Sequence, residues 1–173
     1  MLSFFSRFPA ELYVFIISML PIVELRGSIP WGAATGLPFY ISFTLSVIGN
    51  MIPVPIILLF IPRMLDFLEK FKFFKPMVAW IRERAEKNRH RVLVGGGDTG
   101  ENLKMSKKAF LALALFVAIP LPGTGAWTGS LVASLLEMPK RESFLATFIG
   151  VLLSGTVMTL ASYGVVGFLK IFV

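Results

Sequence analysis

The chain has 173 residues, of which 55% are hydrophobic and only 16% are charged, and it contains no cysteine. Soluble domains carry about 25% charged residues, so this composition argues against an ordinary soluble domain. The missing cysteines exclude disulfides and cysteine-based metal or redox sites. The net charge is +7, but 12 of the 17 lysines and arginines lie in residues 63–108. Basic residues gathered between apolar stretches are typical of a cytoplasmic segment, and no nucleic-acid partner is expected.

Three long stretches contain no charged residue at all: 27–62, 109–136 and 143–169. A helix needs about 20 apolar residues to cross a bilayer. We therefore expect an all-α integral membrane protein with one membrane domain over residues 1–173. The N-terminal stretch has one basic residue and an early proline, which predicts a part of the mature protein rather than a signal peptide.

The first apolar stretch, residues 12–23, is too short to cross a membrane and ends near Pro21. It runs into ELRGSIPWG (24–32), where two glycines and a proline predict a break in the helix. Residues 39–62 then form a spanning candidate with three prolines in its second half.

The basic middle segment is predicted to lie at the membrane surface. Apolar residues recur at helical spacing over 64–92, with lysines and arginines between them and Trp80 among them, which indicates an amphipathic interfacial helix. Pro76 is expected to break this helix into two pieces. Residues 95–108 have the composition of a flexible linker.

The stretch 109–136 is interrupted by PLPGTG (120–125), which cannot form regular helix. Its two halves, 109–119 and 126–136, are each about 16 Å long as helices, roughly half the hydrocarbon core. The chain therefore either turns back as a re-entrant hairpin or crosses once as a broken helix. Residues 141–172 form a last long segment.

The two ends of the chain resemble each other. With a shift of 101, residues 38–52 match residues 139–153 at five of 15 positions, and Pro21 matches Pro120 after a two-residue gap. We predict two inverted repeats, each a re-entrant or broken-helix hairpin followed by a long transmembrane helix, over 12–62 and 109–173. The alternative is that the two halves are unrelated and each uses proline and glycine only to interrupt or end helices.

Glu24 and Arg26 are the sharpest functional candidates, because they stand directly before a long uncharged stretch. A charge at membrane depth costs several kcal/mol and usually faces a cavity or a partner. Glu24 is a candidate for binding a proton or a cation, and Arg26 for gripping a phosphate or carboxylate. The alternative is an interfacial pair in which the two charges neutralise each other.

Further candidates for substrate or ion binding lie at the breaks, where broken helices offer free amides and carbonyls, or inside the first long helix. Trp127 could equally be a packing residue, and Asn50 could form an interhelical hydrogen bond. No catalytic motif, metal site or cofactor motif supports an enzyme. The further candidates are Pro21, Pro30, Asn50, Pro120, Pro122, Gly123, Thr124, Gly125, Trp127 and Thr128.

ELRGSIP (24–30), PLPGTGAWTGS (120–130) and the linker between them resemble the small multidrug export protein family of prokaryotes, over nearly the whole chain. That family is similar in plan to the DedA (VTT-domain) superfamily, whose members carry two re-entrant hairpins in inverted repeat. The resemblance implies a small transporter. Members of the superfamily are linked to membrane potential, drug resistance and movement of polyprenyl phosphate or other lipids. Their hairpin acid matches Glu24, while their arginines near the second hairpin have no match in 120–130; Arg26 and Arg141 are the nearest.

The sequence thus predicts a transporter of the cell membrane, with residues 63–108 cytoplasmic. We expect proton- or sodium-coupled secondary transport of a small or lipid-linked substrate, with Glu24 as the coupling carboxylate. Membrane lipids are the expected partners, and a homodimer is expected because one chain barely encloses a pathway. Two alternatives stay open: a scramblase or flippase of an anionic carrier lipid such as a polyprenyl phosphate, and a non-transporting membrane scaffold.

Overall fold

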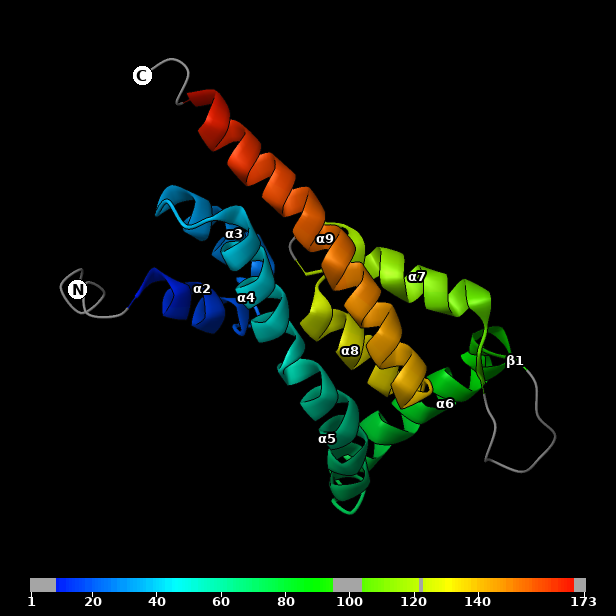
Figure 1. The fold of residues 1–173 in the computed structure, drawn as a ribbon. Coiled ribbons are helices and arrows are strands. Elements are labelled where there is room, and N and C mark those ends of the chain that lie inside the picture. The colour runs from blue at the N-terminus through cyan, green and yellow to red at the C-terminus, as the bar shows by residue number, and fades with distance from the viewer. Residues whose placement is uncertain (1–8, 95–103, 122, 170–173) are drawn as a thin grey trace.

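The computed structural model of the chain describes residues 9–94, 104–121 and 123–169. Over these residues the fold is helical, except for one antiparallel pair of two-residue strands (Figure 1). The predicted all-α class is confirmed. Two helices, Phe39–Leu68 and Lys140–Gly167, are long and apolar enough to cross a membrane.

The first half of the chain forms a short hairpin and a long helix. Helices α2 (Ala10–Ser18) and α3 (Glu24–Ala34) pack against each other and against α4 (Phe39–Met51), which continues almost directly into α5 (Pro53–Leu68). Pro53 stands at the first position of α5, where a helix tolerates the missing N–H.

The break predicted at residues 24–32 is wrong, because that stretch is the helix α3 and the chain turns earlier, at residues 19–23. Pro30 lies inside α3. Gly32 serves close packing instead of a turn, since a Cβ there would overlap the hydroxyl of Ser42 on α4. The glycine therefore brings the helices together without interrupting α3.

The second half repeats this order. Helix α7 (Lys107–Ala118) is capped at its amino end by Ser106, whose hydroxyl accepts a hydrogen bond from the Ala109 N–H at 3.1 Å. Helix α8 (Ala126–Leu135) follows the PLPGTG turn, and α9 (Lys140–Leu169) is the second long helix. The two predicted half-length helices around that turn are confirmed to within a residue or two.

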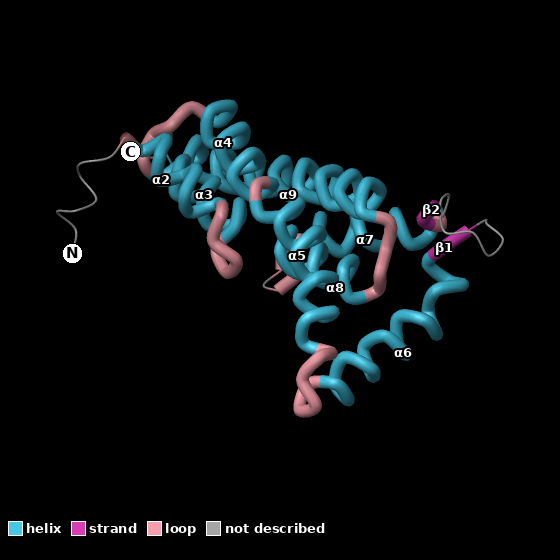
Figure 2. Tube along the Cα trace, turned by 90° about the horizontal axis from the view of Figure 1, so that it is seen from below, coloured by secondary structure: helices cyan, strands magenta, loops and turns pink. Residues whose placement is uncertain are grey.

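Between the halves, α5 continues to Leu68 and a short turn leads into α6 (Lys75–Val92). Residues 64–92 are divided into two helical pieces as predicted, but the turn comes at residues 69–74, just before the predicted break, and Pro76 is the second residue of α6, a position that suits proline. Figure 2 shows α6 at the edge of the helical body, next to β1 (Leu93–Val94) and β2 (Lys104–Met105). Residues 95–103 of the predicted linker lie outside the described residues.

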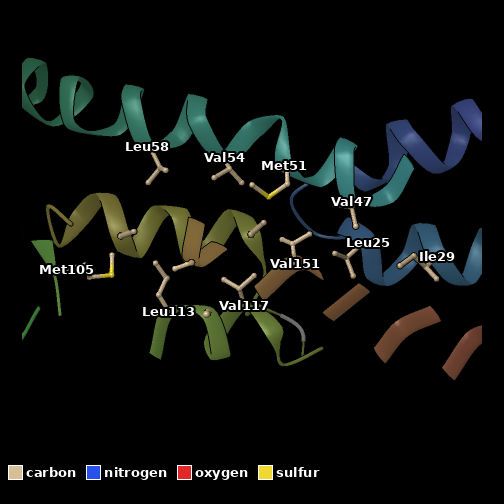
Figure 3. Packing of buried hydrophobic residues seen from close by; sticks show 14 residues of the cluster. Leu25, Ile29, Val47, Met51, Val54, Leu58, Met105, Leu113, Val117 and Val151 are labelled. Atoms are coloured by element: carbon tan, nitrogen blue, oxygen red, sulfur yellow. The ribbon is translucent and has the colours of Figure 1, made fainter. Parts of the chain in front are cut away.

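The two long helices run in opposite directions and contact each other (Figure 1). Near the start of α9, the Glu142 carboxylate accepts a hydrogen bond from the Met105 N–H. Near the end of α9, the Tyr163 hydroxyl donates to the Leu37 carbonyl at 2.8 Å. Helix α3 packs on α9 and α8 packs on α5, so each hairpin contacts the long helix of the other half. The central apolar cluster lies among these helices (Figure 3).

Backbone hydrogen bonds recur 101 residues apart at the ends of α3 and α8. The Leu37 N–H donates to the Gly32 carbonyl at 3.0 Å, and the Met138 N–H donates to the Ala133 carbonyl at 2.9 Å. Between them, Gly36 and Glu137 both have positive φ, at 79° and 51°. The shift found in the sequence therefore also relates the geometry of these two helix ends.

Glycines continue the correspondence on the long helices. A Cβ on Gly49 would meet the Phe15 carbonyl of α2 at 2.6 Å, and a Cβ on Gly150 would meet the Ala114 carbonyl of α7 at 2.6 Å. Gly49 and Gly150 are 101 residues apart, while Phe15 and Ala114 are 99 apart. This difference equals the two-residue gap that the sequence comparison required.

Candidate functional site

The turns of the two hairpins meet each other in the structure. The turn after α2 and the start of α3 contact the loop between α7 and α8, although about 100 residues separate them in the sequence. We call this contact the tip junction. It comprises Met19, Glu24, Arg26, Ile119, Leu121, Thr124, Gly125 and Trp127.

Glu24 is the buried acid of the tip junction, with only 4% of its surface exposed. Its carboxylate accepts a hydrogen bond at 3.2 Å from the backbone N–H of Trp127, the second residue of α8. The amino end of a helix carries a partial positive charge, so a carboxylate is stabilised there. Glu24 itself has φ 51°, which costs a non-glycine residue about 1–2 kcal/mol, and the surrounding contacts must hold it in place.

Arg26 binds the other side of the turn in the second hairpin, next to the carboxyl end of α7. Its guanidinium donates hydrogen bonds to the carbonyls of Leu121, Ile119 (3.1 Å) and Thr124 (2.6 Å), and to the Thr124 hydroxyl (3.1 Å). These acceptors follow the carboxyl end of α7, which carries a partial negative charge. A planar guanidinium with several donors is suited to bridging such a set of carbonyls.

Glu24 and Arg26 form no ion pair with each other within the part of the chain that the structure describes. The two opposite charges still attract each other through space, but direct pairing is not what holds either side chain. The acid faces the start of α8 and the base faces the end of α7, so each charge is balanced by backbone dipoles of the other hairpin. This arrangement joins the two hairpins through their tips.

Gly125 and Trp127 complete the tip junction. A Cβ on Gly125 would overlap the Glu24 carboxylate, so only glycine leaves room for the acid at this position. The indole N–H of Trp127 donates to the Met19 carbonyl at 3.1 Å, which ties α8 to the turn of the first hairpin. Trp127 thus has both a packing and a hydrogen-bonding role.

The other predicted residues lie in different places. Pro21, Pro120 and Gly123 are exposed on the two turns, Pro30 lies within α3, and Thr128 is half-buried on α8. They make no hydrogen bond to Glu24 or Arg26 among the described contacts. Pro122 lies outside the described residues.

Asn50 lies away from this network, on α4. It is 1% exposed, and neither its amide nitrogen nor its oxygen has a hydrogen-bond partner among the described atoms. The predicted interhelical hydrogen bond is therefore not found among the residues that the structure describes. A buried amide without a partner is costly, so Asn50 remains a position of interest apart from the tip junction.

A buried polar row on the two long helices was not predicted. It places small hydroxyl or amide groups at helical spacing toward the protein interior, and several of them lack a hydrogen-bond partner among described atoms. Spacing of four residues was the available signal, but serine is also common in ordinary helix packing. The row contains Ser42, Ser46, Asn50, Ser143, Thr147 and Ser154.

The family described as "putative small multi-drug export protein" matches residues 24–157, which include the whole tip junction except Met19. The chain belongs to this family. Together with the two long apolar helices, the family indicates a small membrane protein of export or transport. No curated protein and no solved structure matches the chain.

Proposed function

We propose that the chain is an ion-coupled secondary transporter of the cell membrane, in which the tip junction is the gate and Glu24 is the coupling carboxylate. The observation that carries this proposal is a buried acid held by a backbone N–H at the start of α8. An acid in this position is held by interactions that depend on its charge.

Proton binding would weaken the tip junction for a simple reason. A protonated, neutral Glu24 loses its attraction to the amino end of α8, which contributes about 0.3–2 kcal/mol. Its hydrogen bond with the Trp127 N–H also becomes weaker, because the acceptor is no longer charged. The combined bias is about 1–3 kcal/mol, which shifts an equilibrium between closed and open junctions about 5- to 150-fold. A sodium ion at the carboxylate would screen the same interaction.

The proposal includes two inverted repeats whose re-entrant hairpins enter from opposite sides of the membrane, as in the plan of the DedA superfamily. It is supported by the hydrogen bonds and glycine contacts that recur with the 101-residue shift. It is also supported by the crossed packing of α3 on α9 and α8 on α5. With residues 63–108 in the cytoplasm, α3 would end outside the cell and α8 inside it. A homodimer would complete the pathway.

Cysteine accessibility tests this topology, because the chain has no cysteine of its own. Thr35 and Glu137 are exposed at the ends of α3 and α8. In intact cells an impermeant maleimide should label Thr35→Cys and should label Glu137→Cys only after the membrane is opened. Labelling of both from the same side would contradict inverted repeats.

Proteoliposomes that contain a pH-sensitive or a sodium-sensitive dye test the coupling. When ethidium is added as a drug-like probe, proteoliposomes with the wild-type protein should dissipate a proton or sodium gradient. Glu24→Gln should reduce this flux about tenfold, since the amide still accepts the Trp127 N–H but binds no proton. Glu11→Gln makes the same chemical change at an exposed acid on α2 and should leave the flux unchanged.

Two results would contradict coupled transport. One is that wild-type protein dissipates neither gradient, with or without the probe. The other is that Glu24→Gln and Glu11→Gln give the same flux while both elute as folded protein in detergent.

A further inference from the structure

A groove lies between α5 and the first turns of α9, away from the tip junction. Its volume is about 410 Å³, within the range of small-molecule sites. Leu58 is buried, whereas Pro55 and Leu59 are exposed, so the apolar groove opens on the outer surface of the two long helices. The lining residues that matter here are Pro55, Leu58, Leu59, Lys140, Arg141 and Phe144.

A second groove of about 330 Å³ lies between α4 and the later part of α9. Each of its lining residues is 101 positions from a lining residue of the first groove. The decisive difference is charge, because Phe39 and Tyr40 stand where the first groove has Lys140 and Arg141. The apolar positions Pro55, Leu58, Leu59 and Phe144 correspond to Thr156, Thr159, Leu160 and Phe43.

With α9 placed across a bilayer, the two cations come to the depth of lipid phosphates. Lys140 and Arg141 begin α9, about 20 Å along the helix from the middle of its apolar span near Ser154. Half of a bilayer with its headgroups is also about 20 Å thick. The apolar walls therefore lie at the depth of acyl chains, with positive charge above them.

Both cations are available to an anion. Neither Lys140 nor Arg141 forms an ion pair with a described residue, and the amino end of α9 adds its own partial positive charge. Two acids lie nearby: Glu142 accepts a hydrogen bond from the Met105 N–H, and Glu137 is exposed before α9. Neither acid lines the groove.

We propose that this basic groove binds one anionic phospholipid from the leaflet that faces residues 63–108. Its phosphate contacts Lys140 and Arg141, and an acyl chain lies along the apolar walls of α5 and α9. The matching groove at the other end has the apolar walls without the cations and does not select anionic lipid. The proposal does not depend on transport, because it rests on the outer surface of the long helices.

Native mass spectrometry of the purified full chain tests this site, with phosphatidylglycerol and phosphatidylcholine as probes. Wild-type protein should bind one phosphatidylglycerol in preference to phosphatidylcholine. Replacing both cations, Lys140→Gln with Arg141→Gln, should weaken phosphatidylglycerol binding about 30-fold. The control, Lys107→Gln with Lys108→Gln, removes the same charge from two exposed lysines on α7 and should change binding less than about threefold.

Two further variants separate a shaped groove from general charge attraction. Leu59→Trp fills the groove without changing any charge and should also abolish preferential binding. Phe39→Lys with Tyr40→Arg places the cations in the second groove and should add a second phosphatidylglycerol. Equal losses in the two double-glutamine variants, or full binding to Leu59→Trp, would overturn the proposal.

Discussion

Replacing Gly125 by alanine should test the geometry of the tip junction most directly. The backbone of Gly125, with φ −106° and ψ −166°, is open to alanine, so no backbone strain is expected. The added Cβ would overlap the carboxylate of Glu24. The carboxylate must therefore move, and its hydrogen bond with the Trp127 N–H is lost.

The size of this effect follows from that lost bond. A hydrogen bond to a charged group contributes about 1.5–3 kcal/mol, and the displaced carboxylate loses at least the bond from the Trp127 N–H. For a chain of this length, each kcal/mol corresponds to about 2–4 °C in melting temperature. Gly125→Ala should therefore lower the melting temperature of the detergent-solubilised protein by roughly 3–12 °C.

A double-mutant cycle with Glu24→Asp identifies the cause. Aspartate is one methylene shorter than glutamate, so Glu24→Asp alone loses the hydrogen bond with the Trp127 N–H. In the Gly125→Ala background, the shorter side chain leaves room for the added Cβ. The two losses should overlap, with a coupling energy of about 1–2 kcal/mol. Gly123→Ala is the control: nothing lies within 4 Å of its Cβ and its φ is 84°, so it should destabilise through strain alone and add to Glu24→Asp. Additive losses for Gly125→Ala and Glu24→Asp would refute the contact.

Three further outcomes follow from the same structure. Gly49→Ala and Gly150→Ala each place a Cβ against a backbone carbonyl that cannot rotate away, so both should lower the melting temperature by similar amounts, while Gly164→Ala, with nothing within 4 Å, should not. Trp127→Phe removes the indole donor between the hairpins and should cost about 1 kcal/mol in chemical unfolding; an unchanged midpoint would contradict that bond. Arg26→Lys keeps the charge but cannot bridge several carbonyls at once, so it should lower the melting temperature and change the proton flux in proteoliposomes.

Much of the fold could be predicted because membrane helices leave strong local signals. Uncharged runs located both long helices, and proline with glycine located the turn at residues 120–125. The shift of 101 was readable from a few identical residues and also relates the two lateral grooves. The first hairpin was misread because glycines such as Gly32 interrupt a helix in one setting and allow close packing in another.

By itself the sequence determined the membrane class, the family and the identity of the two charged candidates beside the first long apolar run. Only the tertiary structure decided what Glu24 and Arg26 contact. Apart from the Thr124 hydroxyl, their partners are backbone amides and carbonyls 93 to 103 residues away, and nearly every residue type carries those groups. No residue pattern marks them, so the contact between the hairpin tips, and the gate proposed from it, emerges only when the two halves of the chain are packed together.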